Sequence, residues 1–254
     1  MTGSDAPWIY RYNRALTQYT DAGILQGAYG PRMRRWNDRV DQLDHVRRML
    51  TADPDSRQVV IQLYNPERDT RGHRDVPCTL SYRFFIRQGQ LRMHTTMRSQ
   101  DLWLGLPYDL FTATLVQELL AGWLGVEIGE YRHTVDSLHL YAQHQEAASA
   151  LPRQPPPSPR MLPVVVPWDD FALVTDATIA GTPVTAVTAV TEADDAWTTF
   201  AHIMASYRAW SDGDRTTAHA LAAAAAGELG AALRRWYGHL SASQLHQAAA
   251  GAHQ

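Results

Sequence analysis

The stretch RSQDLWLGLPYDLF, residues 98–111, carries an Arg-Ser pair, two acids and a Gly-x-Pro turn directly before an apolar segment. Apolar residues at helical spacing predict a largely buried helix over residues 110–124. Asp109 stands at the mouth of this helix, where a carboxylate is a good N-cap. The same carboxylate can accept a hydrogen bond from the amino group of a ligand. The two interpretations are compatible.

Segments on either side of this stretch predict strands mixed with helices. Residues 38–50 have helical spacing with Asp38 near their start, residues 57–65 predict a strand, and residues 80–98 predict a hairpin that turns at 88–90. After a Pro-rich connector, VVVPW (164–168) and TPVTAVTAVT (182–191) are typical of strands, and the chain is predicted to be helical from about residue 192. This mixture predicts an α+β fold.

The composition bounds the function. The chain has 254 residues, 45% of them hydrophobic, and a net charge of -3, which is typical of a soluble globular protein. It lacks the overall positive charge that favours non-specific binding to nucleic acids. There is no run of 18 apolar residues and no signal peptide, so we expect a cytoplasmic protein with no membrane partner. Every one of the 23 cationic residues is Arg. The absence of Lys excludes Schiff-base chemistry and a P-loop.

Cys78 is the one cysteine, so the chain has no intrachain disulfide and no cysteine-built metal site. A single cysteine is usually a small buried hydrophobe. The alternative is a nucleophile, which needs a nearby cation to lower its pKa, and Arg98 across the predicted hairpin can supply that charge. Arg57 and the pair Arg98-Ser99 are candidate phosphate ligands. The alternative for each arginine is a solvated surface residue.

His139 and Tyr141 lie two residues apart, so they share one face of a predicted strand. They are either a pair that binds hydroxyl groups or the polar face of an edge strand. The nearby histidines 133, 139 and 144 have a spacing that fits no common metal site, and we expect no metal.

These residues together resemble thymidylate synthase and its relatives, over roughly residues 23–145. The motifs are Pro77-Cys78, RSQD (98–101), LGLPY (104–108), HLY (139–141), GAYGPRMRRW (27–36) and DPDSRQVVIQLYN (53–65). The resemblance implies one domain over residues 1–254, with a mixed β-sheet layered by helices and a homodimer formed through the sheet. Residues 165–254 are divergent, Ala-rich and helical.

The resemblance also implies an enzyme of pyrimidine nucleotide biosynthesis. Cys78 would add to carbon 6 of a nucleoside monophosphate, and carbon 5 would then attack a one-carbon unit from 5,10-methylenetetrahydrofolate. Tyr29 would lie near the reacting carbon, and Asp101 near the base and the folate.

Substrate-binding residues follow from the same resemblance. Arg98 and Ser99 would hold the phosphate, with Arg57 reaching across from the partner subunit. The sugar hydroxyl would be bound by His139 and Tyr141.

Asp109 departs from the synthases, which carry Asn at this position. An amide donates and accepts, which suits uracil, whereas an ionised carboxylate only accepts and suits the amino group of cytosine. An acceptor facing the uracil carbonyl would cost about 1–3 kcal/mol or more. In carrying Asp here the chain resembles the family members that act on cytidylate, notably the deoxycytidylate 5-hydroxymethylases, so we favour cytosine over uracil as the base.

A second departure concerns the product. The synthases carry a Trp-rich segment before the Tyr-Gly motif that favours hydride transfer, and residues 9–28 contain no Trp. We expect water to capture the exocyclic methylene, so that the product carries a hydroxymethyl group. We favour dCMP over CMP. The alternatives are a pyrimidine nucleotide C5-methyltransferase and a non-catalytic nucleotide-binding relative, since the upstream glutamate and the folate-closing tail of the family are not recognisable.

Overall fold

A computed structural model describes residues 8–154, 161–182 and 194–251. The chain divides into two compact units, Met1–Pro156 and Pro157–Gln254. Each unit is described by itself below. The single domain expected over residues 1–254 stays a prediction.

A four-stranded sheet forms the centre of the N-terminal unit, with strand order β1-β2-β3-β5. Strands β1 (Val60–Gln62), β2 (Thr79–Arg87) and β3 (Gln90–Met97) are antiparallel, whereas β5 (Glu127–Val135) runs parallel to β3. The predicted hairpin is confirmed. Gln88 and Gly89 have φ of 55° and 73°, the left-handed conformations that a two-residue turn between twisted strands requires. The predicted strand over 57–65 is shorter, because only its centre pairs with β2.

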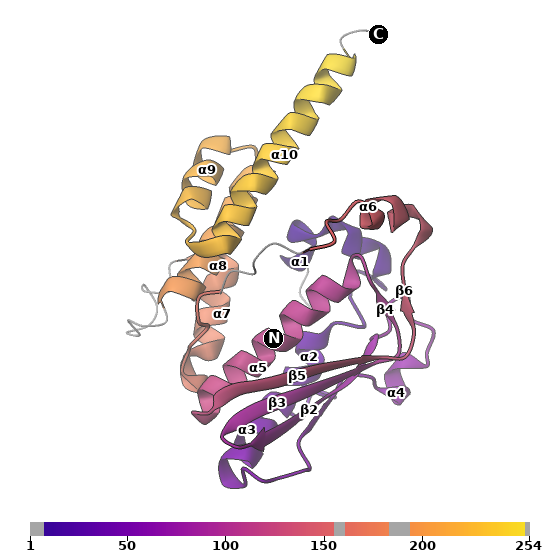
Figure 1. The fold of residues 1–254 in the computed structure, drawn as a ribbon, viewed down its shortest axis with the longest axis vertical. Coiled ribbons are helices and arrows are strands. Elements are labelled where there is room, and N and C mark those ends of the chain that lie inside the picture. The colour runs from indigo at the N-terminus through magenta and orange to yellow at the C-terminus, as the bar shows by residue number, and fades with distance from the viewer. Residues whose placement is uncertain (1–7, 155–160, 183–193, 252–254) are drawn as a thin grey trace. The chain divides into compact units, whose positions relative to one another are not determined.

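Helix α5 (Gly105–Leu124) packs against strands β3 and β5 and covers one face of the sheet (Figure 1). The buried side chain of Gln117 ties this helix to both strands by donating to the carbonyl oxygens of Leu91 (2.8 Å) and Gly129 (3.1 Å). Beyond the sheet, β4 (Gln100–Asp101) and β6 (Leu138–His139) form a short parallel pair. This pair lies at the start of α5, where the site described below is built.

Two helix starts differ from the sequence prediction. Helix α5 begins at Gly105, so Asp109 lies inside the helix, and the prediction that Asp109 caps it is wrong. The carboxylate of Asp101 accepts hydrogen bonds from the backbone N–H groups of Trp103, Leu104 and Gly105 instead. Helix α3 (Gln42–Ala52) is likewise capped by Asp41 and not by Asp38. Periodicity locates a helix, but the competition between nearby acids decides its first residue.

A buried ion pair joins helix α2 (Tyr29–Arg34) to helix α4 (Pro66–Asp69). Both terminal nitrogens of Arg32 donate to Asp69, at 2.7 and 2.6 Å, and the two side chains are 2% and 0% exposed. Arg32 also donates to the carbonyl oxygens of Gln26 and Leu63. The pair therefore anchors the helix that carries Tyr29. The remaining elements of this unit are α1 (Trp8–Tyr12), η1 (Arg14–Tyr19), η2 (Ala142–His144) and α6 (Gln145–Ser149).

The regular structure of the C-terminal unit is helical among its described residues, with η3 (Trp168–Asp170), α7 (Phe171–Ala180), α8 (Asp194–Ser211), α9 (Arg215–Ala224) and α10 (Gly227–Gly251). The prediction of helices after residue 192 is confirmed. The prediction of a strand over VVVPW is wrong: Val164 and Val166 are buried but unassigned to any strand, because an apolar run signals burial and not pairing. Most of TPVTAVTAVT lies outside the described residues.

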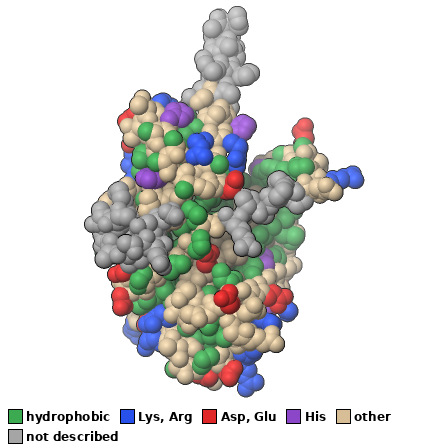
Figure 2. Space-filling model, turned by 60° about the vertical axis from the view of Figure 1, so that its left-hand side comes forward, with side chains coloured by type: hydrophobic (Ala, Val, Ile, Leu, Met, Phe, Trp, Pro, Cys, Tyr) green, Lys and Arg blue, Asp and Glu red, His purple; other side chains and the backbone are tan. Residues whose placement is uncertain are grey.

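Side chains of both charge signs are interspersed over the face that Figure 2 displays. None of the described helices combines the length and the apolar character needed to cross a bilayer.

Candidate active site

The hairpin brings Cys78 and Arg98 together, because Cys78 precedes β2 and Arg98 follows β3. The backbone N–H of Arg98 donates to the carbonyl oxygen of Cys78 at 2.9 Å. Its guanidinium donates to the carbonyl oxygens of Pro77 (Nε, 3.1 Å) and Val76 (Nη2, 2.9 Å). Arg98 therefore orients the loop that carries the thiol as well as placing a positive charge beside it.

Burial raises the pKa of the Cys78 thiol, Arg98 lowers it in part, and the carboxylates of Asp109 and Asp75 raise it further. The net pKa lies above the ordinary value. The sequence-based expectation that Arg98 would depress this pKa is therefore only half right, because burial, the largest cause, together with the two acids outweighs the guanidinium. The thiol form of Cys78 predominates near neutral pH.

Tyr29 approaches the same point from helix α2. Its hydroxyl oxygen accepts hydrogen bonds from the backbone N–H (3.3 Å) and the hydroxyl (3.0 Å) of Thr79, the residue that follows Cys78. Burial and then the charge of Asp109 raise the pKa of Tyr29 far above its ordinary value. Tyr29 is therefore a neutral phenol, and its O–H group can still donate a hydrogen bond.

Asp109 lies in the second turn of α5, facing this cluster. Burial raises the pKa of its carboxyl group, and a hydrogen bond from the side-chain amide of Gln100 to Oδ2, at 2.8 Å, lowers it in part. The charge of Asp109 raises the pKa of Cys78 and of Tyr29, so these three groups lie within electrostatic reach of one another. A thiol, a phenol and an acid thus converge from the loop before β2, from α2 and from α5.

The second group of sequence-predicted residues surrounds the β4–β6 pair. Asp101 on β4 is paired in register with His139 on β6, and the His139 and Tyr141 rings contact edge to face with centroids 4.9 Å apart. Burial would raise the pKa of Asp101, but its three backbone N–H donors hold that pKa below the ordinary value. Asp101 is therefore an ionised carboxylate that is already engaged as a cap. Ser99 lies between Arg98 and β4 and is partly exposed.

Arg57 is the one candidate that the fold keeps away from the others. It is exposed and precedes β1, whose Val60 pairs with Arg83 in the middle of β2, whereas Cys78 precedes the opposite end of β2. Several residues of extended strand, at about 3.3 Å each, separate the two positions. Within one chain, Arg57 does not contribute to the Cys78 cluster.

The family model described as thymidylate synthase matches residues 8–174, more than half of the chain. The chain belongs to the thymidylate synthase family. The expected thymidylate-synthase-like α+β fold is thereby confirmed, with its mixed sheet and covering helices. A curated relative, the deoxyuridylate hydroxymethyltransferase of Bacillus phage SP01, is 38% identical over 151 residues. The aligned part covers 54% of this chain and 39% of the relative, so the chain spans about two fifths of that protein.

In this thymidylate synthase family member, three polar residues of the site were missed by sequence reasoning about catalysis. Gln100, His133 and Tyr131 form hydrogen bonds to one another and to Asp109. The available signal was the alternation along β5, which puts residues 131 and 133 on the strand face that packs toward α5. Gln100 was visible only as a polar residue inside the RSQD motif, and its burial at 2% exposure comes from the fold.

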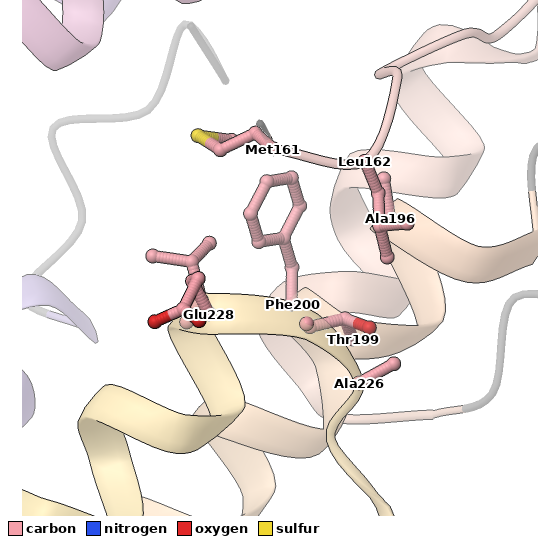
Figure 3. A pocket seen from close by; sticks show the side chains of 9 residues that line it. Met161, Leu162, Ala196, Thr199, Phe200, Ala226 and Glu228 are labelled. Carbon is pink, nitrogen blue, oxygen red and sulfur yellow. The ribbon is translucent and has the colours of Figure 1, made fainter. Parts of the chain in front are cut away.

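The C-terminal unit offers no comparable site among its described residues. Its pocket between Met161, Phe200 and Glu228 holds about 20 Å³, room for about one water molecule and not for a nucleotide (Figure 3). No cluster of three or more potential metal-ligating His, Cys, Asp or Glu side chains occurs in the part of the chain that the structure describes.

Proposed function

We propose that this thymidylate synthase family member is an enzyme that converts a cytidine monophosphate to its 5-hydroxymethyl derivative. The observation that carries the proposal is a partly buried carboxylate, Asp109, within electrostatic reach of the thiol of Cys78. An acceptor-only group beside a nucleophile suits a ring with an exocyclic amino group. The net reaction replaces the hydrogen on carbon 5 with a hydroxymethyl group, using a methylene unit and one water molecule.

Each residue of the cluster has a distinct part in this proposal. Cys78 gives its proton to water and forms a bond from Sγ to carbon 6, which makes carbon 5 nucleophilic. After carbon 5 has gained the one-carbon unit it loses its own proton, the 5,6 double bond re-forms, and the bond from Sγ to carbon 6 breaks. Asp109 accepts from the amino group and holds a proton on the ring nitrogen. Tyr29, a neutral phenol, donates a hydrogen bond to the water molecule that accepts the proton leaving carbon 5.

The one-carbon donor in this proposal is 5,10-methylenetetrahydrofolate, which supplies a methylene unit when bound. A flat aromatic group fits the border of the site, where Leu102, Leu104 and Tyr108 expose 41%, 53% and 65% of their surface beside the start of α5. We propose that these apolar side chains and Asp101 hold it.

The phosphate and the sugar occupy the side of the site formed by β4 and β6. Arg98 and Ser99 bind the phosphate, and His139 and Tyr141 bind the sugar hydroxyl. We favour dCMP over CMP, because Ser99 is the residue that deoxynucleotide-binding family members carry.

Arg57 joins the site only in a homodimer. The sheet face opposite to α5 carries exposed or partly exposed side chains of both charges and the rings of a phenylalanine and a histidine, namely Arg83, Phe85, Arg92, His94, Glu130 and Arg132. We propose that two copies associate through this face, so that Arg57 of one copy reaches the phosphate of the other.

A uracil nucleotide is the second candidate substrate. It is favoured by the name of the relative, deoxyuridylate hydroxymethyltransferase, at 38% identity. The chemistry of the cluster is also compatible with methylation in place of hydroxymethylation, and with nucleotide binding without catalysis.

One experiment separates these possibilities. CMP, dCMP, UMP and dUMP carrying tritium on carbon 5 are incubated with the protein, with and without methylenetetrahydrofolate, and released tritium is counted. We expect folate-dependent release from a cytosine nucleotide, loss of release in Cys78→Ala, and a product whose mass corresponds to addition of CH2OH in place of H.

Each contrary result has a definite meaning. Release from uracil nucleotides alone would overturn the proposed base. A product heavier by only a methyl group would overturn hydroxymethylation. Binding of a nucleotide without release of tritium from carbon 5 would indicate a non-catalytic, nucleotide-binding relative.

A further inference from the structure

We propose that Gln100 and His133 are positioning residues that set the base preference of Asp109, through a hydrogen-bond chain that runs from β5 to α5. The inference rests on the proposed function, because it concerns how the same site tells cytosine from uracil. Neither residue is expected to touch the nucleotide. Each acts through the next member of the chain.

The chain is continuous in the structure. Starting from β3, the hydroxyls of Thr95 and Tyr131 lie 3.0 Å apart, and the Tyr131 hydroxyl lies 2.7 Å from Nδ1 of His133. Nε2 of His133 lies 3.0 Å from Oε1 of Gln100, whose amide nitrogen donates to Oδ2 of Asp109 at 2.8 Å. Four elements, β3, β5, β4 and α5, therefore share one line of hydrogen bonds that ends on the carboxylate.

The protonation of His133 gives the chain a direction. Burial lowers the pKa of this histidine, so the ring is neutral and carries one N–H. The amide oxygen Oε1 of Gln100 can only accept a hydrogen bond, so the N–H of the neutral ring lies on Nε2 of His133 and donates to it. With its oxygen occupied in this way, Gln100 presents its N–H group to Asp109. The amide is thereby held in one of its two orientations.

The orientation of Gln100 matters because it favours one charge state of Asp109. An N–H donor stabilises the ionised carboxylate, which is otherwise disfavoured by burial. If the amide turned round, Oε1 would face the carboxylate, acceptor against acceptor, and Asp109 would have to hold a proton. A protonated carboxyl both donates and accepts, which is the pattern that uracil needs. Gln100 and His133 therefore favour the form of Asp109 that selects cytosine.

The sheet supplies matched controls for a purely structural role. His94 is also a partly buried histidine on a strand of the same sheet, but it contacts the Phe85 ring on the face opposite to α5. Gln117 is as buried as Gln100, and its amide ties α5 to β3 and β5 without reaching Asp109. Substitutions at these positions change the packing of the sheet and α5 but remove no member of the hydrogen-bond chain that ends on Asp109.

The test measures binding of dCMP and dUMP to the full-length protein by titration calorimetry, in the unmodified chain and in Gln100→Leu, His133→Phe, His94→Phe and Gln117→Leu. A hydrogen bond to a charged group contributes enough for about a tenfold change in affinity. We expect the ratio of dCMP affinity to dUMP affinity to fall about tenfold in Gln100→Leu and His133→Phe, and to stay unchanged in the two controls.

A second pair of variants separates coupling from general disruption. In an Asp109→Asn background the carboxylate is absent, so Gln100→Leu should no longer change the ratio. An equal effect of Gln100→Leu in both backgrounds would overturn the inference, as would an unchanged ratio in the single variant.

The direction of the chain has its own readout, which needs no nucleotide. Imidazole ¹⁵N chemical shifts of His133 should show a protonated Nε2 and an unprotonated Nδ1; the opposite tautomer would overturn the inference. If the unmodified protein binds neither nucleotide, the proposed function fails, and the tautomer alone then decides whether the chain runs toward Asp109.

Discussion

The amide nitrogen of Gln100 lies 2.8 Å from Oδ2 of Asp109, although the two residues belong to different elements and nine positions of sequence separate them. This hydrogen bond fixes the orientation of the Asp109 carboxylate, which acts as a hydrogen-bond acceptor. One carboxylate oxygen is engaged by the protein, so the rest of the carboxylate is presented in a defined direction. Under the proposed function, the base preference of the site therefore depends on the Gln100–Asp109 pair and not on Asp109 alone.

Asp109→Asn should reverse the base preference. An amide can donate to the uracil carbonyl and no longer holds a proton on the cytosine ring. We expect the ratio of kcat/KM for the cytosine nucleotide to that for the uracil nucleotide to fall at least tenfold, equivalent to about 1–3 kcal/mol. The measurement is competitive tritium release. The exposed acid at the end of β5 provides the control, Asp136→Asn, which should leave the ratio unchanged.

Alkylation of Cys78 should report the charges around it, and the label is unambiguous because the chain has one cysteine. Burial, Asp109 and Asp75 raise the thiol pKa, so the pH at which iodoacetamide reacts at half its maximal rate should lie above the value of about 8.5 for a free thiol. Asp109→Asn should lower this midpoint, and Arg98→Gln should raise it. A midpoint below that of a free thiol would contradict the electrostatic account given for the site.

Asp69→Ala should strongly destabilise the N-terminal unit, because it leaves the buried guanidinium of Arg32 without its carboxylate. Breaking a buried pair typically costs about 3–5 kcal/mol, which urea unfolding can measure. Asp44→Ala is the control. Asp44 pairs with Arg47 and Arg48 nearer the surface, where ion pairs contribute at most about 1 kcal/mol.

The Arg32–Asp69 pair also predicts a pH dependence. Burial would raise the pKa of Asp69, but Arg32 and the Asn65 N–H hold it below its ordinary value. A carboxyl group whose pKa is lower in the folded state contributes stability above its unfolded pKa of about 3.9. That contribution is lost as the pH falls through the lower, folded pKa. Asp69→Ala should therefore flatten the acid limb of the stability curve, measured by urea unfolding between about pH 5 and pH 2.

The core of the C-terminal unit predicts an asymmetry between two substitutions. Ser206 donates to the carbonyl oxygen of Ala218 at 2.7 Å and lies 2.9 Å from the hydroxyl of Tyr237, and both side chains are fully buried. Tyr237→Phe leaves Ser206 bonded, so it should cost about 0.5–1.5 kcal/mol. Ser206→Ala leaves the buried Tyr237 hydroxyl without this hydrogen-bond partner and should lower the free energy of unfolding by about 1–3 kcal/mol. Thermal or urea unfolding of the two variants gives the order, and equal costs would contradict it.

Local chemistry in the sequence determined much of the fold around Cys78. The Gln88-Gly89 turn dictates a hairpin, because both residues adopt left-handed conformations that join antiparallel strands. The hairpin in turn brings position 98 back beside position 78. The motifs from Tyr29 to Tyr141, with their order and spacing, were enough to predict the family that the chain belongs to.

Only the tertiary structure decided what Asp109 does. The sequence predicts that Asp109 lies at the start of a helix. In the structure, Asp101 accepts the hydrogen bonds of the first N–H groups, and Asp109 lies inside α5. Its partner Gln100 is in turn contacted by His133, which is 33 residues further along the chain. Such contacts arise when strands pair and a helix packs across them, and no local periodicity encodes them. The proximity of Cys78 and Arg98 was therefore predictable from the sequence, whereas the hydrogen-bond chain that ends on Asp109 required the packed sheet.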